Sequence, residues 1–155
     1  MDFVGGLGEE AESLFADHVV KAQPMLPATS MLELMAVASR EVLDKGAAVS
    51  PPCLSQLVFE KPLVFQPGSK VSLSVSVDSY GQVRLMSTSE VDEGEDRIHA
   101  YAQILTSAIE LPDLDNKTIL KACPDEVDIA KAYAELQKIG LAYGPRFRTI
   151  KRAFK

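Results

Sequence analysis

The sequence predicts an α+β domain in which an antiparallel sheet wraps around one central helix. The first observation behind this prediction is a long apolar segment, residues 29–45, that follows Pro27 and ends near Gly46. Proline stops a helix that arrives from upstream, and glycine commonly follows a helix end. The second observation is a succession of β-rich segments between residues 54 and 107. A buried helix followed by successive strands is typical of an α+β layer architecture.

The predicted helix carries apolar residues around most of its circumference. A helix of this kind is expected to be buried, so we predict a central position for it. Thr29 and Ser30 are suited to cap the free N–H groups of its first turn. Its apolar positions are Leu32, Leu34, Met35, Val37, Ala38, Val42 and Leu43.

Five segments are predicted to be strands. Residues 54–59 and 62–65 are β-rich and are separated by a break. Residues 71–78 alternate apolar and polar side chains, which is the period of a strand with one buried face. Residues 82–87 pair back after a turn, and residues 97–107 form the last strand after an acidic loop. The residues expected to face the core are Val71, Leu73, Val75, Val77, Val83 and Leu85, and then Ile98, Ala100, Ala102 and Ile104 on one face of the last strand.

The two ends of the chain are predicted to be less regular. Residues 1–10 are rich in glycine and acidic residues, which indicates a frayed lead-in, and residues 109–125 are polar and indicate a linker. A second helix is predicted from about residue 126 to residue 139, ending at Gly140. The basic residues near the C-terminus are expected to be a solvated chain end: Arg146, Arg148, Lys151, Arg152 and Lys155.

Composition limits the classes of function. The net charge of -6 argues against nucleic-acid binding, because a phosphate backbone needs a basic patch. No apolar run is long enough to span a bilayer, and the N-terminus lacks the pattern of a signal peptide. We therefore expect no membrane association and a cytoplasmic location. Cys53 and Cys123 match no metal-binding spacing, so we expect thiols in a reducing compartment and no metal site.

His18 precedes Pro27 by nine residues, with Ala22 between them. This spacing resembles the His-x-x-x-Gly-x-x-x-x-Pro motif of the dehydratase domain of polyketide synthases and animal-type fatty acid synthases, which has a hotdog fold. Leu32-Glu33 is similar to the Tyr-Leu-Glu of the family's central helix. Ala22 stands where the family has glycine. A methyl group there would cause strain if the position needs a positive φ, so we hypothesise that Ala22 weakens activity.

Two further motifs resemble the same family. Residues 99–102, His-Ala-Tyr-Ala, are similar to the His-Ala-x-Gly at the end of its first hotdog. Residues 140–147, Gly-Leu-Ala-Tyr-Gly-Pro-Arg-Phe, match the Gly-Leu-x-Tyr-Gly-Pro-x-Phe at the entry to its second. The resemblance implies the first half of a double hotdog. It places the first hotdog in residues 1–108, a linker in residues 109–125, and in residues 126–155 a helix and first strand that lead into a second, missing hotdog.

The resemblance also implies a reaction, the loss of water from a 3-hydroxyacyl thioester on the phosphopantetheine arm of an acyl carrier protein, with no bound cofactor. Such a reaction needs a base, an acid and donors for an enolate oxygen. The implied base is His18, since the pKa of histidine lies near neutral pH. From the residue alone, a single histidine is more often a packed or surface residue. The residues implied in substrate binding are Ala22, Pro27, Ala28, Thr29, Tyr143, Gly144 and Pro145, with the N–H groups at the helix start as candidate donors.

The acid is missing from this chain. In the family it is an aspartate in an Asp-x-x-x-Gln or Asp-x-x-x-His motif of the second hotdog, whereas the later aspartates here lie in or near the predicted linker. Glu33 is a possible acid, because dimeric single-hotdog dehydratases use a glutamate on the central helix across the dimer interface. The more ordinary role of Glu33 is to find a hydrogen-bond partner near the helix start.

Three functions are open at this point. The first is the N-terminal half of a dehydratase that works with the remainder of a multidomain synthase and is inactive or nearly so alone. The second is a non-catalytic hotdog, either a structural remnant or a module similar to product-template domains, which bind an acyl chain and also keep a histidine. The third is a self-sufficient homodimer that uses Glu33 as its acid.

Overall fold

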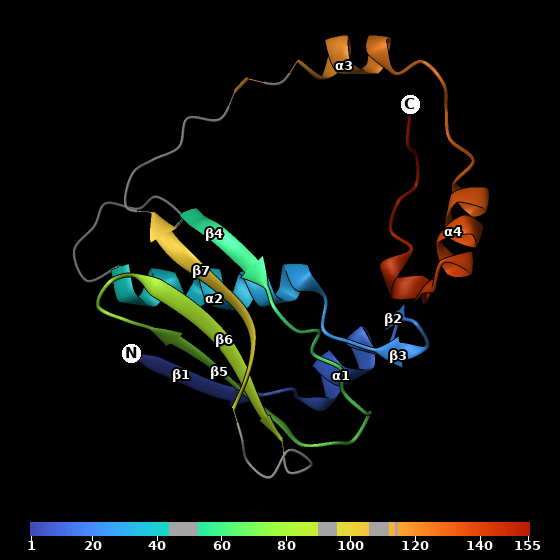
Figure 1. Cartoon of the computed structure of the whole chain (residues 1–155). Coiled ribbons are helices and arrows are strands. Elements are labelled where there is room, and N and C mark those ends of the chain that lie inside the picture. Colours follow the sequence, from blue (N-terminus) through green and yellow to red (C-terminus); the bar gives the residue numbers. More distant parts are fainter. Residues whose placement is uncertain (44–52, 90–95, 106–111, 114) are drawn as a thin grey trace.

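Two antiparallel sheets and one long helix organise the structure (Figure 1). The structure is a computed structural model that describes residues 1–43, 53–89, 96–105, 112–113 and 115–155. Along the chain its elements are β1 (Asp2–Gly6), α1 (Glu9–Phe15), β2 (His18–Val20), β3 (Gln23–Pro24), α2 (Ala28–Leu43), β4 (Cys53–Phe59), β5 (Val71–Val77), β6 (Gln82–Ser89), β7 (Arg97–Leu105), α3 (Asn116–Ala122), α4 (Ile129–Lys138), β8 (Leu141–Tyr143) and the 3-10 helix η2 (Pro145–Phe147). The larger sheet has the strand order β1-β5-β6-β7-β4, and the smaller sheet has the order β3-β2-β8.

The core lies between the larger sheet and α2. The alternation predicted for residues 71–78 is confirmed, because every second residue of β5 from Leu73 onward is buried. Burying an apolar side chain of this size fully contributes about 1.5–3 kcal/mol, so this interface is the main source of stability. The buried apolar residues of the three central elements are Met31, Met35 and Ala38 from α2, Leu73, Val75 and Val77 from β5, and Val83 and Leu85 from β6.

One face of α2 is left uncovered by the sheet. The prediction of a buried helix is confirmed for the face toward the strands, but Leu34 and Val37 are 39% and 42% exposed. Figure 1 shows why: the strands lie along one side of α2. The prediction of a helix buried all round is therefore wrong for this chain.

The helix begins one residue earlier than predicted. α2 starts at Ala28, and the carbonyl of Pro27 accepts the N–H groups of Ser30 and Met31 at 3.0 and 3.2 Å. Thr29 and Ser30 lie inside the first turn, so the expectation that they cap it is wrong. The end predicted near Gly46 lies outside the described residues.

The N-terminal residues form an edge strand and not a frayed lead-in. β1 pairs with β5 over five residues, with Phe3 opposite Val75. The N-terminal amine donates a hydrogen bond of 2.7 Å to the carbonyl of Val77. Phe3 also packs against the core. The prediction failed because the pairing depends on the free edge of β5, whose residues are 66 to 74 positions away from their partners in β1.

A β-bulge in β7 changes which side chains face the core. Leu85 pairs with Ala100 and its neighbour Met86 pairs with Ile98, so His99 is an extra residue in β7. Residues opposite each other in an antiparallel pair share a face, and consecutive residues alternate. Ile98 therefore lies on the face opposite Ala100, and the prediction that the two share a face is wrong.

The bulge places His99 in a buried site where both ring nitrogens have partners. Its Nε2 lies 2.7 Å from the Ser87 hydroxyl, and its Nδ1 lies 3.1 Å from the carbonyl oxygen of Lys61. A carbonyl oxygen only accepts, so Nδ1 carries the proton of the neutral ring and Nε2 accepts from Ser87. Burial lowers the pKa of His99, and the charges of Arg97 and Lys61 act in the same direction, against the hydrogen bonds to the backbone. The neutral ring therefore joins β6 and β7 to the segment after β4.

The C-terminal part of the chain contains more structure than predicted. The predicted linker contains α3, which follows the N-cap residue Asp115. α4 follows the N-cap residue Asp128 and does not begin near Glu126 as predicted. Glu126 instead forms an antiparallel β-bridge with Phe154. The backbone of residues 125–127 is committed to this bridge and to bonds with residues 153 and 155, so it is not available to a helix.

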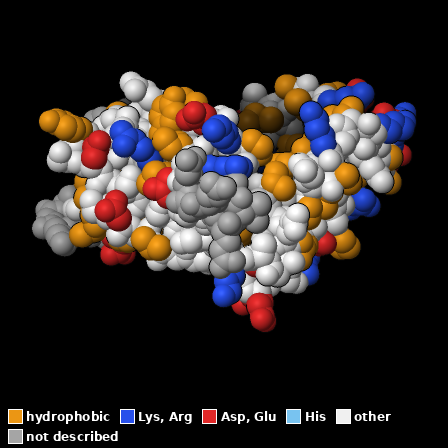
Figure 2. All heavy atoms as spheres, turned by 60° about the horizontal axis from the view of Figure 1, so that its bottom comes forward, with side chains coloured by type: hydrophobic (Ala, Val, Ile, Leu, Met, Phe, Trp, Pro, Cys, Tyr) orange, Lys and Arg blue, Asp and Glu red, His pale blue; other side chains and the backbone are white. Residues whose placement is uncertain are grey.

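Arginines of the predicted solvated cluster make specific contacts, and those of Arg148 and Arg152 lie within the C-terminal part of the chain. The Nε of Arg148 donates to the carbonyl of Tyr143 at 2.7 Å, and its guanidinium lies over the Tyr133 ring at 5.7 Å. Arg152 pairs with Glu126 at 2.7 Å. Figure 2 shows Lys and Arg side chains at the right-hand end of the molecule, where α4 and the C-terminal segment lie. These exposed contacts are individually weak, but they fix the path of the segment.

Acidification is expected to weaken the fold through His99. The pKa of His99 is lowered in the folded protein, so the unfolded chain binds the proton first as the pH falls. The contribution of the neutral His99 ring to the free energy of unfolding is therefore fully present above about pH 6.5. Below this pH it is lost, by at most about 1.4 kcal/mol per pH unit. Urea unfolding at several pH values between about 7.5 and 5.5 measures this loss. His99→Gln should flatten the dependence, and His18→Gln is the matched control that should keep it. An equal slope in wild type and His99→Gln would contradict the prediction.

Candidate functional site

His18 lies where two segments that are far apart in the sequence meet. It is the first residue of β2, and it stands opposite Tyr143 of β8 in the antiparallel pair. Its imidazole stacks on the Tyr143 ring, with 5.3 Å between centroids and 21° between planes, and the Phe147 ring lies 5.2 Å away at 50°. The third sequence motif, residues 140–147, therefore packs around the histidine of the first.

One hydrogen bond sets the chemical state of the His18 ring. Its Nδ1 lies 2.8 Å from the carbonyl oxygen of Met25. Because that oxygen only accepts, Nδ1 must donate, and the neutral ring has its free lone pair on Nε2. The N–H of Met25 also donates to the carbonyl of His18 at 3.1 Å. The ring is thus oriented as a proton acceptor through Nε2.

A tight turn brings Met25 back to His18. β2 and β3 pair with Val20 opposite Gln23, which leaves Lys21 and Ala22 as the two turn residues. Their φ angles are +48° and +64°. Positive φ at both central residues defines a type I′ turn, whose second position favours glycine. Ala22 therefore occupies a left-handed conformation. This is the condition under which a methyl group at the position of the motif glycine causes strain.

The start of α2 presents free backbone donors. Pro27 is buried, whereas Ala28 and Thr29 are exposed. The N–H groups of Ala28 and Thr29 have no acceptor among the residues that the structure describes, while the N–H of Ser30 is bonded to Pro27. The positive end of the helix dipole lies at the same place. Ala28 and Thr29 are therefore the donors that a negatively charged oxygen would find.

Glycine is required at both ends of β8. Gly140 has a φ of +94° and its carbonyl accepts the N–H of Lys21 at 2.7 Å. Gly144 donates its N–H to the carbonyl of Asp17 at 2.7 Å, and a Cβ at Gly144 would overlap the Asp17 carboxylate. Both glycines allow β8 to approach the β2 segment closely.

Of the predicted site residues, the structure places Tyr143 against His18 and gives Glu33 no contact with it. Tyr143 contacts His18, Gly144 contacts Asp17, and Pro145 begins η2. Glu33 is exposed, and within the described ranges we find no hydrogen bond or ion pair for it. Its expected hydrogen-bond partner near the helix start is therefore not found there.

Two residues at the site were not predicted. Phe147 contacts the His18 ring, and Asp17 contacts the segment that carries Phe147. Asp17 directly precedes the predicted His18 in the sequence. Phe147 is the last residue of the third motif. No local pattern pairs them, because the residues they contact are more than 120 positions away.

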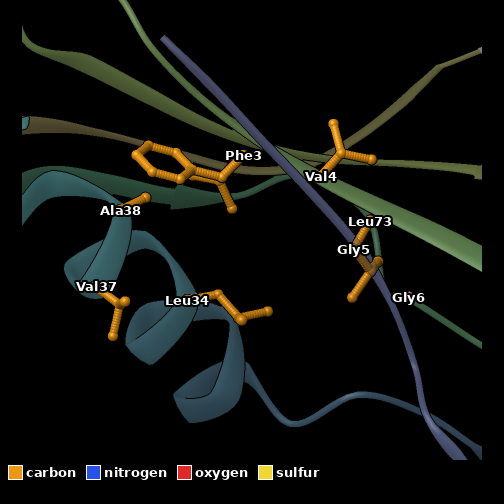
Figure 3. Close-up of a pocket in the computed structure, with 9 residues that line it drawn as sticks. Phe3, Val4, Gly5, Gly6, Leu34, Val37, Ala38 and Leu73 are labelled. Carbon is orange, nitrogen blue, oxygen red and sulfur yellow. The ribbon is translucent and has the colours of Figure 1, made fainter. Parts of the chain in front are cut away.

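An apolar groove runs between β1 and α2, apart from the predicted site residues (Figure 3). It has a volume of about 230 Å³ and is lined by residues that include Phe3, Leu34, Val37 and Leu73. Gly5 and Gly6 of β1 have no side chains to fill it.

The described residues hold no group of three or more His, Cys, Asp and Glu side chains placed to bind a metal ion. Neither Cys53 nor Cys123 forms a disulfide. Among the helices of the described ranges, we find none with the length and apolar character that crossing a membrane requires.

Two family descriptions match the chain. The polyketide synthase dehydratase domain matches residues 2–90, and the polyketide synthase dehydratase N-terminal domain matches residues 112–154. The two matches include both segments that meet at His18.

Several curated proteins are similar to the chain. The phenolphthiocerol synthesis polyketide synthase type I Pks15/1 of Mycobacterium bovis is 30% identical over 150 residues, which are 94% of this chain and 7% of that protein. The polyketide synthase PksN of Bacillus subtilis is 26% identical over 149 residues, which are 92% of this chain and 3% of that protein. The chain thus spans less than a tenth of these large multidomain synthases.

Solved dehydratase structures share the fold. The structure described as giving insights into dehydratase substrate selection for the borrelidin and fluvirucin polyketide synthases has a TM-score of 0.81 at 25% identity, over 100% of this chain and 54% of that one. The dehydratase domain from the CurF module of the curacin polyketide synthase has a TM-score of 0.81 at 22% identity, over 99% of this chain and 56% of that one. The predicted α+β hotdog fold is therefore confirmed, and the chain spans about half of each structure.

Replacing Ala22 with glycine is expected to stabilise the fold. A left-handed conformation costs a residue with a Cβ about 1–2 kcal/mol, part of which is offset by the greater freedom of glycine in the unfolded chain. We expect Ala22→Gly to raise the free energy of unfolding by about 0.5–1 kcal/mol in urea titrations. The matched control is Ala134→Gly on the exposed face of α4, which should lower it by about 1 kcal/mol. If Ala22→Gly lowered the free energy of unfolding as much as Ala134→Gly does, residue 22 would not be strained.

Proposed function

This chain belongs to the polyketide synthase dehydratase family, whose N-terminal part it contains, and we propose that it supplies the base of a dehydratase acting on 3-hydroxyacyl thioesters. The observation that carries the proposal is the state of His18. Its Nδ1 is bound to the carbonyl of Met25, three residues before the start of α2, which leaves Nε2 as the proton acceptor. Histidine is the side chain best suited to this work near neutral pH.

The reaction follows from these groups. Nε2 of His18 takes the proton from the carbon next to the thioester carbonyl. The N–H groups of Ala28 and Thr29 stabilise the charge that develops on the carbonyl oxygen. The electron pair then forms a carbon–carbon double bond as the bond to the 3-hydroxyl breaks, and the hydroxyl leaves as water after it receives a proton from an acid.

We place the acid outside this chain. Two solved structures are inactive variants of the CurK dehydratase, one with a histidine replaced by phenylalanine and one with an aspartate replaced by asparagine. In CurK that aspartate follows the histidine by more residues than follow His18 here. If His18 takes the role of that histidine, the corresponding aspartate lies outside these 155 residues. The isolated chain should then be inactive or nearly so.

The proposed setting is a multidomain synthase in the cytoplasm. The relatives are large synthases of which this chain matches a small part. We propose that the substrate arrives on the phosphopantetheine arm of an acyl carrier protein and that the reaction uses no bound cofactor.

A homodimer with Glu33 as the acid is one alternative. It is favoured by the exposure of Glu33, which has no partner in the part of the chain that the structure describes. Leu34 and Val37 are exposed on the same helix, and a second copy could cover them. A non-catalytic hotdog that binds an acyl chain is the other alternative, and it also keeps a histidine.

Replacing His18 tests the proposed base. The assay follows formation of the unsaturated thioester from a 3-hydroxyacyl pantetheine thioester by the complete protein that includes this chain and the acid. We expect His18→Gln to lower the rate by at least about 100-fold, because general bases typically contribute factors of this size. His99→Gln, checked for folding, is the matched histidine control and should keep the rate. A loss of less than about tenfold in His18→Gln would refute the role. Thioester binding without turnover by the wild type would favour the non-catalytic hotdog.

An experiment on the isolated chain separates the proposed dehydratase half from the homodimer. We expect the isolated chain to show no turnover with the same thioester, since its acid is absent. Light scattering after size-exclusion chromatography gives its oligomeric state. A dimer that dehydrates the substrate, and loses this activity in Glu33→Gln, would establish the homodimer in place of the proposed dehydratase half.

A further inference from the structure

Asp17 precedes His18 and holds the segment that packs around it. The backbone carbonyl of Asp17 accepts the N–H of Gly144 at 2.7 Å. Its carboxylate Oδ2 accepts the backbone N–H of Arg146 at 3.0 Å, and the Nε of Arg146 lies 3.7 Å from the same oxygen. The Asp17 side chain is only 24% exposed. Three contacts thus join one residue to a segment on the other side of the site.

The carboxylate acts as an N-cap for η2 from a distant part of the chain. Gly144 occupies the N-cap position and has no side chain to supply an acceptor. Pro145 has no N–H, so the N–H of Arg146 is the first donor of η2 that needs a partner. Asp17 provides it from 129 residues away. The missing Cβ of Gly144 leaves the room in which the carboxylate sits.

The capped segment is the one that contacts His18. Tyr143 precedes Gly144, and Phe147 ends η2. Their rings lie 6.2 Å apart, and the imidazole lies 5.3 and 5.2 Å from them. Asp17 and His18 are adjacent in the chain and contact alternate residues of one segment, 143–147. Asp17 bonds to Gly144 and Arg146, and His18 packs on the rings of Tyr143 and Phe147. A shift of the segment at Asp17 therefore moves the two rings that pack on the imidazole.

We propose that Asp17 is a positioning residue of the dehydratase, whose carboxylate holds Tyr143 and Phe147 against His18 and so keeps the imidazole in one orientation. This inference rests on the proposed role of His18 as the base. Proton transfer is steeply sensitive to the position of the base, and a displacement of about 1 Å can cost about 100-fold in rate. The rival explanation is that Asp17 only attaches the C-terminal segment to the rest of the fold.

Kinetics of the complete protein separate the two explanations. We expect Asp17→Ala to lower kcat by between about 10- and 100-fold with little change in KM, because the imidazole loses its orientation. Asp17→Asn keeps an oxygen that accepts the N–H of Arg146, so it should restore kcat to within about threefold of wild type. Glu126→Ala is the control, since it breaks the Arg152 ion pair in the same C-terminal segment without touching residues 143–147. It should keep kcat.

Several outcomes would overturn the proposal. Wild-type kcat in Asp17→Ala, an equal loss in Glu126→Ala, or no rescue in Asp17→Asn would each leave Asp17 without a positioning role. Gly144→Ala provides a second variant in case Asp17→Ala does not fold. Its added Cβ would displace the carboxylate while the charge remains, and it should lower kcat as Asp17→Ala does. An unchanged kcat in Gly144→Ala would also count against the proposal.

NMR of this chain gives a readout that does not depend on activity. The Tyr143 and Phe147 rings shift the His18 ring proton resonances, so these resonances report whether the rings stay in place. We expect them to move toward the values of an exposed histidine in Asp17→Ala and to stay in Asp17→Asn and Glu126→Ala. Unmoved resonances in Asp17→Ala would overturn the positioning role. Should His18→Gln keep full activity, the proposed function fails, and the resonances still decide whether Asp17 holds the rings.

Discussion

The antiparallel pairing of β2 with β8 is the interaction on which the rest of the site depends. It joins residues 18–20 to residues 141–143 through three residue pairs. Closing a loop of this length costs entropy, and three pairs recover little of that cost by themselves. Further bonds reinforce the pair at both ends, from Lys21 to Gly140 and from Gly144 to Asp17. His18 contacts Tyr143 only because these bonds hold the two short strands together.

The turn between β2 and β3 gives His18 its other partner. Its two central residues adopt left-handed conformations, and the chain reverses sharply there. Met25 therefore lies beside His18, where its N–H donates to the His18 carbonyl and its carbonyl accepts from the imidazole Nδ1. The same reversal leads directly into Pro27 and the start of α2. The strain at Ala22 is therefore connected to the placement of His18 and of the helix donors, because one short hairpin positions both.

The larger sheet covers only one side of α2. Five strands bury one side of α2, so Leu34 and Val37 stay on the surface and a groove remains beside β1. The chain also spans only about half of the solved dehydratase domains that share its fold. The half-covered central helix accords with a chain that spans about half of such a domain.

The sequence by itself determined the features that depend on local patterns. The alternation in β5 predicted its buried face, Pro27 predicted the start of α2 to within one residue, and motif spacing singled out His18 and Tyr143. Tertiary structure alone decided the rest. β1 is a strand because β5 offers a free edge, His99 is buried because a bulge shifts the register, and Asp17 caps η2 because β8 lies beside β2. Each of these depends on backbone hydrogen bonds between distant segments, and such bonds leave no periodic or local signal in the residues that make them.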